Sequence, residues 1–227
     1  MRAPIYELTK ALTDSFLFAT DGQLLQVAKG LEYLHSLNIV HGRLKGVRSL
    51  PNLSGSSISL PSVSNRVIVL IPWQQSNIII DQNCCVRLAD YGLDPIFSDN
   101  TFSYVDNRGV RMLRWMAPET MLDSPPETND IELKQDVFSF GMVGVEIYTG
   151  AFPFSQIKKD TAVGSTICQG GRPEKPSEPE KVGLTGGMWM LLCWCWEEDP
   201  QRRPTAEVVV KVLQILGAGK CDVQRGS

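Results

Sequence analysis

Six cysteines and two histidines are the side chains of this sequence that could form a metal site or a disulfide framework. Cys84 and Cys85 are adjacent, Cys193 and Cys195 flank one tryptophan, and the chain contains no C-x-x-C pair. Structural zinc sites draw on paired cysteine and histidine ligands at characteristic short spacings. The spacing here therefore argues against a metal or disulfide interpretation and predicts reduced, mostly buried thiols.

The other residues that could do chemistry lie in five short segments that follow one another along the chain. They are His41-Gly42-Arg43-Leu44-Lys45, Asp90-Tyr91-Gly92, Ala117-Pro118-Glu119, Asp136 to Gly141, and Arg202 to Thr205. In this order they resemble the catalytic loop, the metal-binding D-F-G, the A-P-E and two anchoring motifs of the large lobe of protein kinases. The resemblance extends from Gln23 to Leu216 and implies a protein-kinase-like C-terminal lobe.

Two details indicate a subgroup. Arg114-Trp115-Met116 before the A-P-E, and Cys195-Trp196 ahead of Arg203-Pro204, resemble the tyrosine-kinase-like group. Lys45 resembles the serine/threonine-type choice at its position.

The resemblance implies ATP and Mg²⁺ as cofactors and transfer of phosphate to serine or threonine of a protein. Asn77 and Asp90 would bind the cofactor by bringing oxygen ligands to Mg²⁺, the donor type that this ion requires. Lys45 would place a positive charge near the transferred phosphate. His41 would be structural and hold the backbone near Asp90.

Three further residues have structural roles in this interpretation. Glu119 and Arg203 are expected to form a buried ion pair between the end of the activation segment and the last helices. Asp136 is expected to accept hydrogen bonds from the catalytic-loop backbone and to cap its own helix.

Arg43 stands where the family has the aspartate that accepts the proton of the substrate hydroxyl. A guanidinium has no lone pair for a proton and stays charged at any relevant pH. A positioned general base contributes about 10²- to 10⁴-fold to the rate. Arg43 therefore predicts a chain that is inactive or severely impaired in phosphate transfer.

The sequence also lacks the glycine-rich G-x-G-x-x-G loop and the V-A-I-K lysine of the family's ATP-binding small lobe. Lys10 and Glu7 occur without that context and are interpreted as surface charges. We expect a lobe whose small N-terminal partner is missing, which makes ATP binding doubtful.

Hydrophobic periodicity predicts a helix from Gln23 to Leu37 capped by Asp21, and a hairpin of 78–80 and 86–88. Further helices are predicted over 137–148, with Asp136 as cap and Gly150 as stop, over 188–196, and over 206–216 behind Thr205. The expected fold is mainly α with a small β hairpin. It comprises a short remnant (1–20), the lobe (21–216) and a tail (217–227).

Composition excludes several function classes. The net charge of −3 provides no electrostatic footprint for nucleic acid, and no apolar stretch reaches the roughly 20 residues that span a bilayer. The start of the chain shows no signal peptide, so a cytoplasmic or nuclear location with protein partners is expected. Two alternatives stay open: a pseudokinase that binds proteins as a scaffold, and a truncated gene model of an active serine/threonine kinase.

An insert of 29 residues, Val47 to Gln75, separates the catalytic loop from Asn77. Without it, His41 and Asn77 would have the family's seven-residue separation. A loop of this length without a hydrophobic period is unusual in a compact domain. Its ends suit a retained intron, because valine codons begin with GT and a glutamine codon can end with AG. Sequencing of the spliced transcript is expected to show codons 47–75 removed, and their persistence would reject this hypothesis.

Overall fold

The computed structural model describes residues 5–49, 77–80, 85–91, 112–121 and 128–223. Within these ranges the α-helices are α1 (Ile5–Ser36), α4 (Asn129–Thr149), α5 (Asp160–Cys168), α6 (Gly186–Cys195) and α7 (Ala206–Val223). The short 3-10 turns are η2 (Pro118–Met121), η3 (Pro179–Val182) and η4 (Pro200–Arg202), and the strands are β1 (Val47–Ser49), β2 (Ile78–Ile80) and β3 (Val86–Leu88). The prediction of a mainly helical fold with a small hairpin is confirmed.

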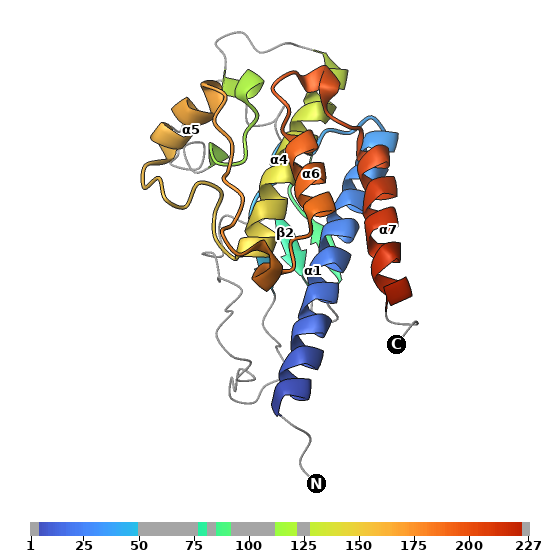
Figure 1. The fold of residues 1–227 in the computed structure, drawn as a ribbon. Helices are drawn as coiled ribbons and strands as arrows, with labels where there is room; N and C mark the ends of the chain where they lie inside the picture. The colour runs from blue at the N-terminus through green and yellow to red at the C-terminus, as the bar shows by residue number, and fades with distance from the viewer. Residues whose placement is uncertain (1–4, 50–76, 81–84, 92–111, 122–127, 224–227) are drawn as a thin grey trace, which may run out of the picture.

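Helix α4 is the centre of the lobe. It is apolar on nearly every face from Val137 to Tyr148, and most of these residues are buried, as expected for a helix surrounded by other elements. Helix α6 packs along α4, while α1 contacts both α4 and α7. Figure 1 shows α7 alongside the upper part of α1, with α5 set apart from the sheet. One hydrophobic core joins these helices.

The sheet has three strands in the order β1-β2-β3. Strands β2 and β3 form the predicted antiparallel pair, with Ile78 opposite Leu88. Strand β1 pairs parallel with β2 and consists of the first three residues of the predicted insert, for which no strand was expected. The remainder of that insert and the hairpin turn at 81–84 lie outside the described residues.

Asp21 is not the N-cap of the first helix, because α1 begins sixteen residues earlier at Ile5. No proline interrupts residues 5–36, so helical propagation continues through the position of the predicted cap. The carboxylate of Asp21 instead accepts a hydrogen bond from the hydroxyl of Tyr148 on α4. Burial, together with Asp21, raises the pKa of Tyr148 well above its usual value.

Asp136 is likewise not a helix cap, because α4 begins at Asn129 and Asp136 lies about two turns inside it. Residues 129–136 are mostly polar and form the first part of the helix, which the apolar pattern alone did not reveal. The predicted C-terminal end is confirmed. Gly150 has a φ of 66°, and its N–H donates to the carbonyl oxygen of Glu146.

The two C-terminal helices agree with their predicted positions. Thr185 caps α6 by accepting from the N–H of Met188, and Thr205 caps α7 by accepting from the N–H of Val208. Helix α7 continues beyond the predicted end to Val223. Helix α5 was not predicted, since its sequence DTAVGSTIC combines a glycine with β-branched residues of low helix propensity.

The cysteines depart from the prediction of mostly buried thiols. Of the four cysteines whose side chains are described, only Cys195 is buried, while Cys85 and Cys168 are exposed. Burial raises the pKa of the Cys195 thiol.

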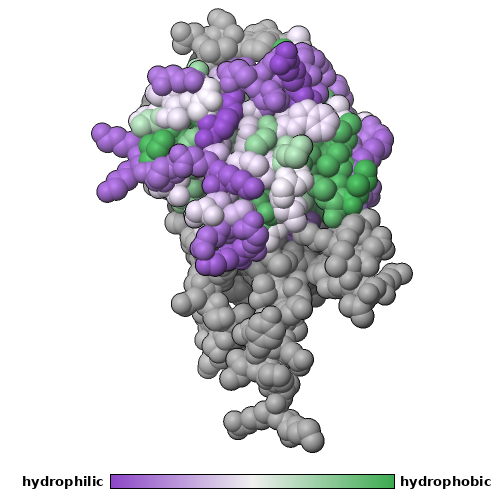
Figure 2. Space-filling model, viewed as in Figure 1, coloured by the Kyte–Doolittle hydropathy of each residue, from purple (hydrophilic) through white to green (hydrophobic). Residues whose placement is uncertain are grey.

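Ile78, the first residue of β2, is fully buried. Figure 2 shows a hydrophobic patch over α7, where Ile215 is 71% exposed. Among the described residues, no helix combines the length and the apolar composition that a membrane span requires.

The close packing of α4 against α6 depends on glycine at position 144. A Cβ there would lie 2.3 Å from Cδ2 of Leu192, which is fully buried. We expect Gly144→Leu to lower the free energy of unfolding by about 1–3 kcal/mol through overpacking.

Gly186→Ala serves as the control for this substitution, because a Cβ at Gly186 meets nothing within 4 Å. Urea unfolding followed by circular dichroism measures both variants. Equal stability of Gly144→Leu and the unsubstituted chain would contradict the described packing.

Candidate functional site

The loop from His41 to Lys45 is held by one buried carboxylate. Asp136 on α4 is 1% exposed and accepts from the N–H of His41 at 2.7 Å and from the N–H of Gly42 at 2.8 Å. His35 Nε2 lies 2.9 Å from the same carboxylate. The contact between Asp136 and the loop backbone, predicted from the sequence, is therefore present.

Two glycines give the loop its shape. Gly42 has a φ of 75° and Gly46 a φ of 59°, a region that glycine enters without steric cost. The fully buried His41 lies just before Gly42, and its Nδ1 accepts from the N–H of Arg43 at 3.3 Å. An accepting Nδ1 assigns the ring proton to Nε2. His41 is therefore buried and bonded to the loop backbone at Arg43, while its predicted contact near Asp90 stays a prediction.

Asn77 connects the loop to the hairpin. Its side-chain Nδ2 donates to the carbonyl oxygen of Arg43 at 2.7 Å, and its backbone N–H donates to the carbonyl oxygen of Lys45 at 3.0 Å. Lys45 and Asn77 are therefore hydrogen-bonded neighbours in space, although 31 residues separate them in the sequence. With Nδ2 used in this way, the amide oxygen Oδ1 of Asn77 is the atom that could bind a cation.

Asp90 lies at the same end of the hairpin as Asn77. Strands β2 and β3 are antiparallel, so the residue before β2 and the residues after β3 meet, and Ala89 N–H donates to the carbonyl oxygen of Asn77 at 2.9 Å. Asp90 is exposed and has a φ of 59°, a conformation that aspartate tolerates better than most residues. The two predicted Mg²⁺ ligands are thus adjacent in the fold.

The two basic residues of the loop differ in exposure. Lys45 is 7% exposed, whereas Arg43 is half-buried. Arg43 occupies the predicted base position, and its backbone makes the contacts that fix the loop to Asn77 and to His41. The structure therefore combines an ordered loop frame with a side chain that cannot accept a proton.

The ion pair predicted between Glu119 and Arg203 is present and buried. Arg203 Nη1 lies 2.5 Å from Oε1 of Glu119, and Nη2 lies 2.9 Å from Oε2, a bidentate arrangement. The Arg203 side chain is 0% exposed, and its Nε also donates to the carbonyl oxygen of Glu197. The pair joins η2 to the turn before α7, and the Arg203 guanidinium stacks over the ring of Phe138 at 5.0 Å.

Arg114 is a structural residue that sequence reasoning missed. Its Nε lies 2.6 Å from Oδ1 of Asp160 at the start of α5, and its other nitrogens donate to the carbonyl oxygens of Pro153, Phe154 and Ile157. This buried guanidinium fixes α5 to the end of the activation segment. The signal in the sequence was the Arg114-Trp115-Met116 motif, which was assigned to a subgroup without a role for the arginine.

A helical lobe whose catalytic loop is tied to a central helix, with two metal-ligand positions at one end of a hairpin, is the large lobe of the protein-kinase fold. Residues 74–213 match the model of the protein tyrosine and serine/threonine kinase family, and the chain belongs to that family.

Known kinases are similar along most of this chain. A light-sensor protein kinase of Ceratodon purpureus is 29% identical over 207 residues, which cover 85% of the chain and 14% of the relative. The serine/threonine-protein kinase STY17 of Arabidopsis thaliana is 28% identical and matches 85% of the chain and 26% of its own length. A G-type lectin S-receptor-like serine/threonine-protein kinase of the same plant is 29% identical over 94% of the chain and 25% of the relative. The chain thus spans about a quarter or less of these relatives.

The buried ion pair generates a prediction about stability. Arg203→Met is expected to lower the free energy of unfolding by about 3–5 kcal/mol, because the carboxylate of Glu119 would stay buried without its partner. Guanidinium unfolding at neutral pH measures the difference.

Arg202→Met is the matched control, since the side chain of Arg202 is 76% exposed and lies 3.9 Å from Asp199. Its effect should stay below about 0.5 kcal/mol. Equal losses in the two variants would contradict the role given to the buried pair.

Proposed function

We propose that this lobe is a non-catalytic member of the protein kinase family that acts by binding proteins. The observation that carries the proposal is Arg43 at the base position of an otherwise ordered catalytic loop. Its carbonyl oxygen accepts from Asn77, and its N–H donates to His41, so the backbone around it keeps its frame. The difference lies in the side chain at the base position, where a guanidinium replaces the carboxylate that would accept the proton.

The chemistry supports loss of transfer in two ways. Without a general base, the substrate hydroxyl loses a contribution of about 10²- to 10⁴-fold. A fixed positive charge on this loop also repels a divalent cation held by Asn77 and Asp90, which raises the cost of placing Mg²⁺ beside the phosphates. Arg43 therefore acts against both the nucleophile and the metal.

The residues at the end of the hairpin are compatible with Mg²⁺ itself. Oδ1 of Asn77 and the carboxylate of Asp90 are hard oxygen donors, and Mg²⁺ commonly takes one or two protein ligands, with waters and phosphate oxygens as the rest. Bound there, Mg²⁺ would neutralise charge on transferring phosphates. Because the guanidinium of Arg43 repels a cation at this position, we infer that this chain binds Mg-ATP weakly.

The segment 47–75 is proposed to be an insert in the catalytic loop. Its support is the hydrogen bond from the N–H of Asn77 to the carbonyl oxygen of Lys45, which brings the two sides of the insert together. Removal of the segment would keep Lys45 close to Asn77 but would also remove β1, the strand that pairs with β2. The family's shorter loop would then form around the same Asp136.

A second candidate function is an active serine/threonine kinase of which this chain is a part. The retention of Lys45, Asn77 and Asp90 favours it, because these are the residues that the family uses on phosphate and metal. The chain also covers about a quarter or less of its relatives. The two candidates differ in whether position 43 limits the reaction.

Phosphate transfer and nucleotide binding test the proposal directly. The chain is incubated with radiolabelled Mg-ATP and a casein substrate, and its melting temperature is measured with millimolar Mg-ATP. We expect no transfer above that of Asp90→Ala and little rise in melting temperature, since stabilisation follows RT ln(1 + [L]/Kd).

Arg43→Asp distinguishes the candidates. Transfer that is absent in the unsubstituted chain and gained in Arg43→Asp would support position 43 as the cause. Transfer by the unsubstituted chain that Asp90→Ala abolishes would overturn the non-catalytic proposal.

A further inference from the structure

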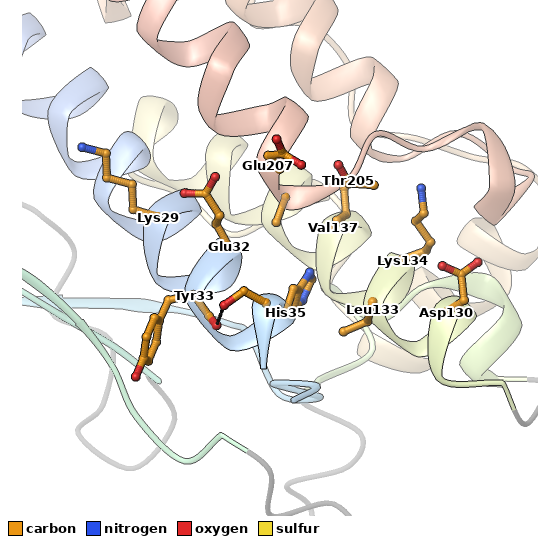
Figure 3. A pocket seen from close by; sticks show the side chains of 12 residues that line it. Lys29, Glu32, Tyr33, His35, Asp130, Leu133, Lys134, Val137, Thr205 and Glu207 are labelled. Carbon is orange, nitrogen blue, oxygen red and sulfur yellow. Dashed lines mark hydrogen bonds between the residues drawn. The ribbon is translucent and has the colours of Figure 1, made fainter. Parts of the chain in front are cut away.

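A groove lies on the side of α1 that faces α4 and the start of α7, behind the catalytic loop. Its volume is about 620 Å³, and it is lined by residues of these three helices and of the turn before α7. Figure 3 shows His35, Leu133, Val137 and Thr205 around its centre, with charged side chains along its edges. No motif of the catalytic loop or of the metal-ligand pair contributes a side chain to it.

The floor of the groove is apolar. Val137 is 1% exposed and Ala206 is 3% exposed, and Leu133 lies half-buried beside them. Tyr33 stands at one edge with 66% of its surface exposed. A floor of this kind removes an apolar side chain of a ligand from water without leaving a polar group unpaired.

The edges carry more negative than positive charge. Glu32, Asp130 and Glu207 contribute three carboxylates, and Lys29 is the exposed ammonium among the lining residues. Lys134 offsets part of this charge, because it interacts with Asp130, but it is only 9% exposed and its Nζ donates to the carbonyl oxygen of Arg203 at 2.6 Å. Burial lowers the pKa of Lys134.

Two of these carboxylates lie at helix N-termini and disfavour binding of an anion there. Asp130 lies in the first turn of α4 and Glu207 in the first turn of α7, so each already complements the partial positive charge of its helix terminus. Outside the groove, Lys211 pairs with Glu207 at 2.5 Å, with both side chains more than 60% exposed. Such surface pairs contribute little, so an arriving cation can replace Lys211.

We propose that this groove binds an extended peptide segment of a partner protein in which lysine or arginine residues flank one apolar side chain. The apolar side chain would lie on Leu133, Val137 and Ala206. The basic residues would pair with Glu32 and Glu207 at one end and with Asp130 at the other.

The groove also reaches the loop through one side chain. His35 lines the groove, and its Nε2 lies 2.9 Å from Oδ2 of Asp136, the carboxylate that holds the N–H groups of His41 and Gly42. An occupant that restrains His35 would therefore slow hydrogen exchange at His41 and Gly42. The site does not depend on whether the lobe transfers phosphate, so peptide binding and the proposed loss of transfer can fail separately.

Fluorescence anisotropy with a fluorescein-labelled peptide KRGLGRK tests the proposal. We expect saturable binding, about tenfold weaker binding of KRGSGRK, which lacks the apolar side chain, and none of the acidic peptide EDGLGDE. Hydrogen exchange measured by mass spectrometry should show protection of the segment 41–42 by KRGLGRK.

Charge-neutral variants with a matched control locate the site. The triple variant Glu32→Gln, Asp130→Asn and Glu207→Gln should bind KRGLGRK about tenfold more weakly. The control, Glu174→Gln, Glu178→Gln and Glu180→Gln, removes the same charge from exposed positions elsewhere and should bind within twofold of the unsubstituted chain. Equal losses in both triple variants, equal binding of the acidic peptide, or no binding of KRGLGRK at millimolar concentration would each overturn the proposal.

Discussion

The buried carboxylate of Asp136 is the contact on which the arrangement of this lobe depends. It lies inside the central helix α4, is almost fully removed from water, and is matched by the N–H groups of His41 and Gly42 and by the ring of His35. A buried charge is tolerated only when such partners are present, so the carboxylate fixes α1, α4 and the catalytic loop relative to one another. The hairpin follows from this, because Asn77 hydrogen-bonds to the loop that Asp136 has ordered.

The frame of the catalytic loop is separate from its chemistry. The hydrogen bonds described for the loop use backbone groups, the imidazole of His41, the amide of Asn77 and the carboxylate of Asp136. None of them requires a carboxylate on the side chain at position 43, so arginine can stand there without disturbing the fold. A kinase-like lobe can therefore keep its shape after the base is lost, which is why family membership alone does not establish activity.

The same carboxylate links the two faces of the lobe. On one side it orders the loop that leads to Asn77 and Asp90, and on the other it contacts His35 in the wall of the groove. The chemistry of the two faces differs: oxygen ligands suited to a hard cation on one, and an apolar floor with acidic edges on the other. Binding of a partner in the groove does not require phosphate transfer at the metal-ligand end of the hairpin.

The amino-acid sequence by itself determined the helical lobe, the hairpin and the start of α7 at Thr205, and the motifs that resemble the kinase family predicted the pairing of Glu119 with Arg203. These follow from local periodicity, capping chemistry and ordered motifs that keep their meaning in isolation. Tertiary structure decided the rest. Asp21 and Asp136 each resemble a helix N-cap in their local sequence, and such a cap stabilises a helix by about 1 kcal/mol. Both residues instead lie inside a continuing helix, and their carboxylates accept long-range hydrogen bonds. The groove also arises only in three dimensions, because its lining comes from segments about a hundred and about seventy residues apart in the chain.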